Sequence, residues 1–155
     1  MRIYVASSWR NEQQQDVVKT LRIAGHEVYD FKNPNNIEKG FHWSNIDPNW
    51  QTWTPEEYRD CLNHPIAEKG YKLDYEAMEW ANVFVGVQPF GRSASLEMGW
   101  AAGRGKPTYL ILENGEPELM VKMLGCICCH VQEVVEFLRP KKSFPLISTC
   151  MHDSC

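Results

Sequence analysis

The clearest sign of the fold is the stretch VFVGVQPFGRSASLEMGWAAGRG at residues 83–105. Its first five residues, Val83–Val87, are continuously apolar, which is typical of a parallel strand buried on both faces. The small residues at 91–95 predict a turn, and residues 96–104 predict a helix that ends at a pair of glycines. A strand, a tight turn and a helix in this order indicate one unit of an α/β sheet.

The same alternation of strand and helix patterns continues on both sides of this stretch. Short β-rich runs predict strands at 2–6, 27–31 and 108–112. Apolar residues at helical spacing predict helices at 11–24 and 67–81, and Gly70 could interrupt the second of them. The capping box TPEE at 54–57, with a proline at the first helical position, predicts a short helix to about residue 62. Weaker helical patterns cover 118–124 and 131–138 and leave room for an edge strand between them. Alternating strands and helices predict a parallel sheet with right-handed crossovers.

We interpret residues 1–139 as a single domain and residues 140–155, where the patterns end, as a C-terminal tail. The chain has 155 residues, enough for one domain with its own hydrophobic core. Residues 32–58 form a Trp-rich insertion. A loop of this length inside a compact domain is usually functional.

The charge and hydropathy of the chain argue against two classes of partner. The formal net charge is −4 and no basic run is present, which disfavours binding to duplex nucleic acid. The N-terminus, MRIYV, leads directly into a strand pattern without a signal core, and no apolar run reaches transmembrane length. We therefore expect a cytoplasmic protein without a membrane partner.

The cysteines raise the question of a metal site. Cys126 and Cys129 have C-x₂-C spacing, but the only later partners are Cys150, His152 and Cys155 in the tail. Cytoplasmic cysteines stay reduced, and isolated ones are usually buried and inert. We expect neither a metal nor a cofactor.

Polar turns follow the first and third predicted strands, at residues 7–10 and 88–97. In an open α/β sheet, ligands bind beyond the carboxyl ends of the strands, where the strand order reverses. The two turns should therefore be neighbours in space. They contain the candidate substrate contacts Ser7, Ser8, Arg10, Gly91, Ser93 and Ser95.

Glu97 is the candidate nucleophile, because it is expected in the first turn of the helix after the third strand. The positive end of a helix keeps a carboxylate ionised, and its free N–H groups can hold phosphate or sugar oxygens. The alternative is that Glu97 only complements the helix dipole, while Ser93 or Ser95 only caps the helix.

Asp74 is a second carboxylate that the pattern places toward the core. It shares one helical stripe with Ala77, Met78 and Ala81. A buried carboxylate is unfavourable unless it is paired or used, although Asp74 could instead be a late N-cap. Two carboxylates at one pocket suit glycoside chemistry, in which Glu97 attacks the anomeric carbon and Asp74 assists departure of the base.

The insertion carries aromatic residues that could stack on a nucleobase, and Trp43 is the candidate contact. The alternative is a self-packed loop or a subunit interface. Asp30, at the end of the second strand, is either a polar substrate contact or a turn residue.

Taken together, these motifs resemble the nucleoside 2-deoxyribosyltransferase superfamily, which includes the 2'-deoxynucleoside 5'-monophosphate N-glycosidases. The matching parts are YVASSWR at 4–10, Asp74 seven residues before Ala81, and SASLEMG at 93–99. The resemblance covers residues 1–115. Together with the strand and helix pattern, it implies a three-layer, doubly wound α/β fold. Its mostly parallel sheet would have four or five strands in the flavodoxin-like (Rossmann-like) order 2-1-3-4-5.

The resemblance also implies roles for residues of this chain. Glu97 would be the nucleophile, Tyr4 would orient it, and Asp74 would be the helix aspartate of the site. Ser8 and Arg10 would bind a 5'-phosphate, as could Ser93 or Ser95. The substrate would be a small-molecule nucleoside or its 5'-monophosphate, with the sugar transferred to another base or to water.

The family completes its site with a residue of a neighbouring subunit, which implies a homodimer or a higher homo-oligomer. This chain differs from the family at Asn82, where an Asp is frequent, and at Glu118, where the monophosphate branch has a Ser. Two alternatives are a non-catalytic nucleotide-binding or signalling module and an NAD glycohydrolase.

Overall fold

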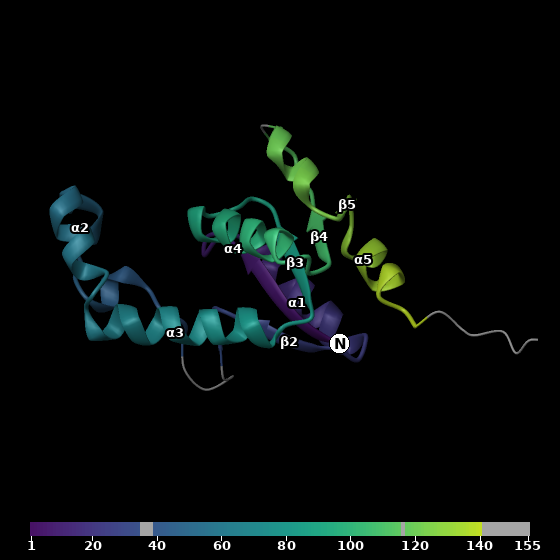
Figure 1. Ribbon diagram of the computed structural model, residues 1–155, viewed down its shortest axis with the longest axis horizontal. Helices are drawn as coiled ribbons and strands as arrows, with labels where there is room; N and C mark the ends of the chain where they lie inside the picture. The colour runs from purple at the N-terminus through teal and green to yellow at the C-terminus, as the bar shows by residue number, and fades with distance from the viewer. Residues whose placement is uncertain (35–38, 116, 141–155) are drawn as a thin grey trace, which may run out of the picture.

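The core of the molecule is a five-stranded, all-parallel sheet in the order β2-β1-β3-β4-β5 (Figure 1). The computed structural model describes residues 1–34, 39–115 and 117–140. Its strands are β1 (Arg2–Ser7), β2 (Glu27–Asp30), β3 (Val83–Val87), β4 (Thr108–Ile111) and β5 (Cys126–Cys128). The predicted strand order is confirmed, and the weak edge strand is present as β5, paired in parallel with β4.

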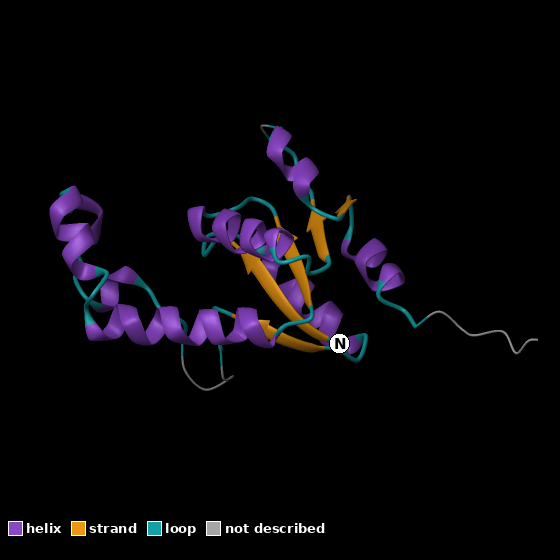
Figure 2. Ribbon diagram, viewed as in Figure 1, coloured by secondary structure: helices purple, strands orange, loops and turns teal. Residues whose placement is uncertain are grey.

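Helices cover both faces of the sheet and make three layers (Figure 2). They are α1 (Gln13–Ile23), α2 (Pro55–Cys61), α3 (Pro65–Trp80), α4 (Arg92–Gly103) and α5 (Val131–Phe137). Side chains alternate along a strand, so Ile3 and Val5 of β1 pack with α1 and α5. Tyr4 and Ala6 pack on the opposite face with α3 and α4. The second face carries the functional candidates.

Two helices differ from the sequence prediction in ways that affect the site. Helix α4 begins at Arg92 instead of residue 96, because the small residues predicted as a turn wind into helix and bury Ala94 against the sheet. Helix α3 continues through Gly70 without interruption. A Cβ at Gly70 would lie 2.7 Å from Cβ of Phe41, so this glycine allows the insertion to pack closely on α3.

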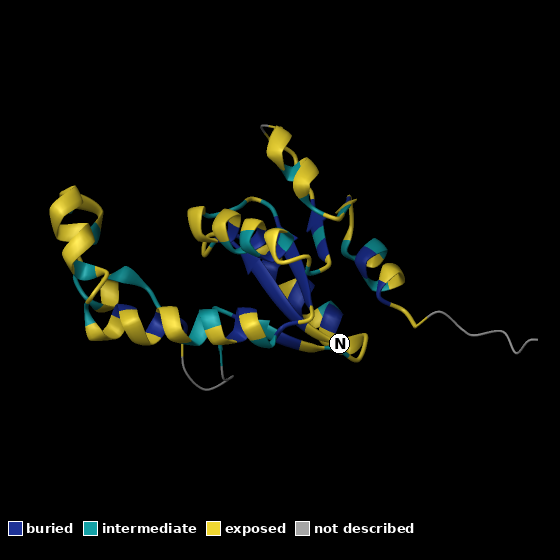
Figure 3. Cartoon of the chain, in the orientation of Figure 1, coloured by how far each residue is buried: buried dark blue, intermediate teal, exposed yellow. Residues whose placement is uncertain are grey.

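The insertion contains two short 3₁₀ helices, η1 (Trp43–Asn45) and η2 (Trp50–Thr52), before α2. The predicted capping box of α2 is confirmed, with Thr54 and Glu57 each accepting from the other's backbone N–H. No residue of α2 is buried, and the helix extends away from the sheet (Figures 1 and 3). Residues 118–124, predicted as helix, contain the 3₁₀ helix η3 (Leu119–Met123).

Within the described ranges, none of the helices combines the length and the apolar character that crossing a bilayer requires. Most of the predicted tail, residues 141–155, lies outside the described residues, and with it Cys150, His152 and Cys155.

Candidate active site

An aromatic row across three strands forms the floor of the candidate site. Tyr4 of β1 is in register with Tyr29 of β2 and Phe84 of β3, so the three side chains project from the same face of the sheet. The Tyr4 ring stacks on both neighbours, with centroid separations of 5.4 Å to Tyr29 and 5.1 Å to Phe84. The Tyr4 side chain is completely buried.

Two carboxyl groups lie over this row, Asp74 from α3 and Glu97 from α4. The Tyr29 hydroxyl donates a hydrogen bond of 2.8 Å to Oδ1 of Asp74. The buried Tyr4 hydroxyl makes no hydrogen bond of ordinary geometry with any described residue, yet it is close enough to Glu97 to influence the charge of that carboxyl. The three residues predicted as catalytic are therefore together, and Tyr29 joins them.

Burial shifts the pKa of both carboxyl groups upward. It raises the pKa of Glu97 to about 8, with a further contribution from the negative charge of Asp74 and an opposing one from the Tyr4 hydroxyl. It raises the pKa of Asp74 to about 6, against the opposing hydrogen bond from Tyr29. The expectation that the helix terminus keeps Glu97 ionised is wrong for the free protein. Because α4 begins at Arg92, Glu97 lies in the second turn, beyond the free N–H groups.

The raised pKa of Glu97 predicts that Glu97→Gln stabilises the protein at neutral pH. Folding disfavours the charged carboxylate, so Glu97 lowers the free energy of unfolding once it must ionise. This loss is absent below the ordinary pKa of 4.5, grows as the pH rises, and levels off above about pH 8. Gln removes a penalty of about 3 kcal/mol at pH 7. Urea denaturation between pH 4.5 and 8 measures the difference, and Glu76→Gln on the exposed side of α3 is the control. A Glu97→Gln effect that does not change with pH would contradict this account.

The two polar turns are neighbours, as predicted. A Cβ at Gly91 would lie 3.5 Å from Cα of Ser8, which places the start of α4 against the turn after β1. Ser8 is half-buried, and its hydroxyl accepts a hydrogen bond of 3.2 Å from the Arg10 N–H. Ser93 lies one helical turn before Glu97 and so on the same side of α4. These residues can reach a ligand held beside Glu97.

Three predicted substrate contacts make hydrogen bonds within the protein. The Ser7 hydroxyl donates to the Val87 carbonyl at 2.7 Å and accepts from the Asn11 amide at 2.9 Å, which joins the ends of β1 and β3. Asp30 is only 1% exposed. Its carboxylate accepts from Gln14, Gln15, Asn33 and the Lys32 N–H. Burial by itself would raise the pKa of Asp30, but these hydrogen bonds hold it below its usual range.

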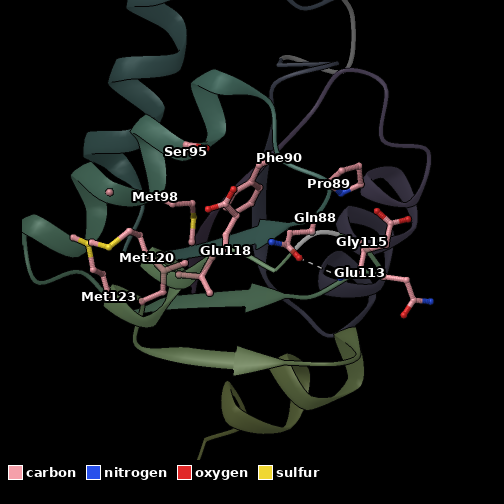
Figure 4. Close-up of a pocket in the computed structure, with 14 residues that line it drawn as sticks. Gln88, Pro89, Phe90, Ser95, Met98, Glu113, Gly115, Glu118, Met120 and Met123 are labelled. Carbon is pink, nitrogen blue, oxygen red and sulfur yellow. Dashed lines mark hydrogen bonds between the residues drawn. The ribbon is translucent and has the colours of Figure 1, made fainter.

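Ser95 is the third of these residues. Its side chain is about 200° around the helix axis from that of Glu97. The Ser95 hydroxyl donates to the Gly91 carbonyl at 3.4 Å and lines a cavity on the other side of α4 (Figure 4). This cavity, of about 530 Å³, lies between α4 and η3, and its lining includes Phe90, Met98 and Met123. Sequence reasoning did not foresee it.

The aromatic residues of the insertion pack on one another, which is the alternative that the sequence left open. The Trp43 ring meets Phe41, Trp53 and Tyr58 edge to face, at centroid distances of 4.8–5.6 Å. The Trp53 indole N–H donates to Asp47 at 2.7 Å. Trp43 is thus part of the internal packing of the loop, and its predicted role as a stacking surface for a base has no support in this arrangement.

The cysteines of β5 and the following residue are free thiols. Cys128 is buried, and burial, followed by the neighbouring Cys126, raises the pKa of its thiol to about 12. Among the residues that the structure describes, no group of three or more His, Cys, Asp or Glu side chains is placed to hold a metal ion.

Several solved structures have the same fold. A 2-deoxyribosyltransferase from Bacillus psychrosaccharolyticus superposes with a TM-score of 0.56 at 23% identity, covering 87% of this chain and 90% of the other. A CMP N-glycosidase from Clostridium botulinum gives 0.50 at 19% identity, covering 89% and 97%. A conserved protein from Enterococcus faecalis gives 0.54 at 11%, covering 86% and 94%.

No protein-family model matches the sequence, and no curated protein is significantly similar to it. The likeness is therefore carried by three-dimensional structure. This chain has the fold shared by these 2-deoxyribosyltransferase and N-glycosidase structures, which confirms the resemblance seen in its motifs at the level of the fold.

Proposed function

We propose that this protein cleaves the N-glycosidic bond of a nucleoside or its 5'-monophosphate through a covalent glycosyl-Glu97 intermediate. The observation that carries the proposal is the pair of half-buried carboxyl groups, Asp74 and Glu97, each beside a tyrosine hydroxyl. The fold adds support, because structures that share it include a 2-deoxyribosyltransferase and a CMP N-glycosidase. A nucleophilic carboxylate beside an acid is the arrangement that retaining glycoside chemistry requires.

In the first step, the Glu97 carboxylate bonds to C1' of the sugar while the C1'–N bond breaks. The electron pair of that bond leaves with the base, which takes a proton from Asp74. In the second step, water or another base attacks C1' and releases Glu97, while Asp74 recovers a proton from the attacking group. Transferase and hydrolase activities differ only in this acceptor.

The chemistry requires one proton on the pair, located on Asp74. Between pH values of about 6 and 8 the pair holds one proton. In the free protein this proton lies mainly on Glu97, so the productive form is the minor one. The Tyr4 hydroxyl favours ionised Glu97. A hydrogen bond from Tyr4 that tightens as substrate binds would increase the productive form.

We therefore expect free base to be released from members of a panel of deoxynucleosides and their 5'-monophosphates. The pH dependence of kcat/KM should be bell-shaped, falling below about 6 as both carboxyls become protonated and above about 8 as both ionise. Chromatography of the reaction products measures the release. Glu97→Ala should lose activity by several orders of magnitude.

Other results of the same assay would exclude this function. Full activity in Glu97→Ala, or no base release from any substrate, contradicts it. Nucleotide binding without turnover, unchanged in Glu97→Gln, would indicate a non-catalytic module. Release of nicotinamide from NAD would indicate an NAD glycohydrolase.

For a monophosphate substrate, we propose that the 5'-phosphate binds between the turn after β1 and the start of α4. Arg10 is exposed on the first segment and Arg92 on the second. The N–H groups of Arg92, Ser93 and Ala94 belong to the first turn of α4, where backbone donors favour anions. Gly91 brings this turn against Ser8.

Arg10→Gln should therefore lower kcat/KM for a 5'-monophosphate by about 10- to 100-fold relative to the matching nucleoside, because a charge-assisted hydrogen bond is lost. Paired assays on the two substrates measure the ratio. Arg104→Gln, whose guanidinium lies over Trp100 at 4.9 Å, is the control. Equal losses on both substrates would exclude a phosphate contact at Arg10.

We also propose that the protein forms a homodimer or a higher homo-oligomer through the apolar surface of η3 and α4. Leu119 of η3 is 80% exposed, Met120 65% and Met123 59%, and Leu96 of α4 is 76% exposed. A cluster of this kind marks an interaction surface more often than isolated apolar residues do.

Sedimentation velocity should show an oligomer for the wild type and a shift toward monomer for Met120→Asp, because a buried unpaired charge opposes association. Ile23→Asp is the control, since Ile23 is 77% exposed on α1, on the other face of the sheet. A wild-type monomer at micromolar concentration, or equal behaviour of both variants, would contradict the proposed interface.

A further inference from the structure

Tyr29 is the member of the site that no sequence motif indicated. It lies in the edge strand β2, and its hydroxyl donates to Oδ1 of Asp74 at 2.8 Å. A tyrosine hydroxyl has one proton to donate, and here it is directed to the carboxyl of the helix that crosses over the strand. Among the described residues, Tyr29 is the hydrogen-bond partner of Asp74.

We propose that Tyr29 is a positioning residue that fixes Oδ1 of Asp74 as a permanent acceptor, so that the catalytic proton is carried and released at Oδ2. This inference rests on the proposed glycosidic function for its catalytic part. The hydrogen bond itself can be tested without any substrate.

The sheet holds Tyr29 rigidly enough for this role. Its backbone is in register with Tyr4, and the two rings are stacked at 5.4 Å with an interplanar angle of 18°. On the other side, α3 holds Asp74 at a height set by its packing of Ala77 and Met78 against the same aromatic face. Because the ring and the helix are both held by packing, the hydroxyl and the carboxyl meet without a flexible segment between them.

The charges around Asp74 explain why this bond matters for ionisation. Asp74 is faced by Tyr29 from β2, Tyr4 from β1 and Glu97 from α4. Burial favours the neutral form of Asp74, whereas the hydrogen bond from Tyr29 stabilises its carboxylate form. Asp30, next to Tyr29, is committed to hydrogen bonds with Gln14 and Gln15 and does not replace it.

Tyr29→Phe removes the hydroxyl and keeps the ring. We expect the midpoint of the Asp74 titration to rise by about one pH unit, because a hydrogen bond to the charged form is lost. In the active enzyme the acid limb of the kcat/KM profile should move by the same amount, while the alkaline limb stays in place. Carboxyl-carbon NMR of ¹³C-labelled aspartate, assigned with Asp74→Asn, reports the titration directly.

Tyr75→Phe is the matched control. Tyr75 follows Asp74 on α3, and its ring stacks on that of Tyr71 at a centroid distance of 5.6 Å. Tyr75→Phe therefore removes a hydroxyl from a neighbouring tyrosine that has other contacts. The Asp74 titration should not move in this variant.

A second substitution should shift the Asp74 titration in the opposite direction. It also keeps the inference testable if Tyr29→Phe does not fold. 3-Fluorotyrosine at position 29 keeps the ring and makes the phenol a stronger donor. It should therefore move the Asp74 ionisation downward.

The inference is overturned if neither substitution moves the Asp74 titration, or if Tyr75→Phe moves it as much as Tyr29→Phe. A moved titration in a protein that releases no base from any substrate would support the hydrogen bond and refute the glycosidic function. The two failures are thus distinguishable.

Discussion

The site depends on the burial of two carboxyl groups over an aromatic row. Removing Asp74 and Glu97 from water is unfavourable, and their proximity makes it unfavourable for both to be charged. Two tyrosine hydroxyls of the sheet offset part of this unfavourable free energy. Tyr29 stabilises the carboxylate of Asp74, and Tyr4 stabilises that of Glu97. The pair therefore shares a proton near neutral pH. Such a pair is suited to a reaction that needs a nucleophile and an acid in one pocket.

Several contacts far from the chemistry hold the two helices that supply these carboxyl groups. The ammonium of Lys106 donates to three carbonyls at the C-terminal end of α3, those of Met78, Glu79 and Ala81. These bonds satisfy acceptors that the helix end leaves free. Near the other end of α3, Gly70 admits Phe41 of the insertion. Helix α4 is held close to the sheet by the small, fully buried Ala94 and Ala101. The separation of the two carboxyl groups is thus set by packing.

The remainder of the molecule divides into surfaces of different character. The aromatic residues of the insertion pack on one another edge to face. The insertion also contacts the turn after β1, where the Trp9 ring meets His42 and the neighbouring Phe31. The surface of η3 leaves its apolar residues unpaired within the described chain, beside the cavity on the far side of α4. The second is the surface suited to a subunit contact.

The sequence by itself determined the architecture, because strands buried on both faces and helices with one apolar stripe leave a local periodic pattern. Val83–Val87 appears in the structure with the predicted bounds, and the capping box at Thr54 marks the start of α2. The motifs around Tyr4, Asp74 and Glu97 likewise named three residues that the fold brings together. Each of these signals lies within a few residues of chain.

Only the tertiary structure decided which polar groups are free to act and in which state of charge. Ser7 and Asp30 carry suitable chemistry in the sequence, but their partners Val87 and Gln14 come from other segments. Tyr29 enters the site through strand register with Tyr4, which one strand cannot specify. The protonation of Glu97 follows from burial and from Asp74, 23 residues earlier in the chain. Desolvation and long-range hydrogen bonds are properties of the assembled fold, so local patterns carry no record of them.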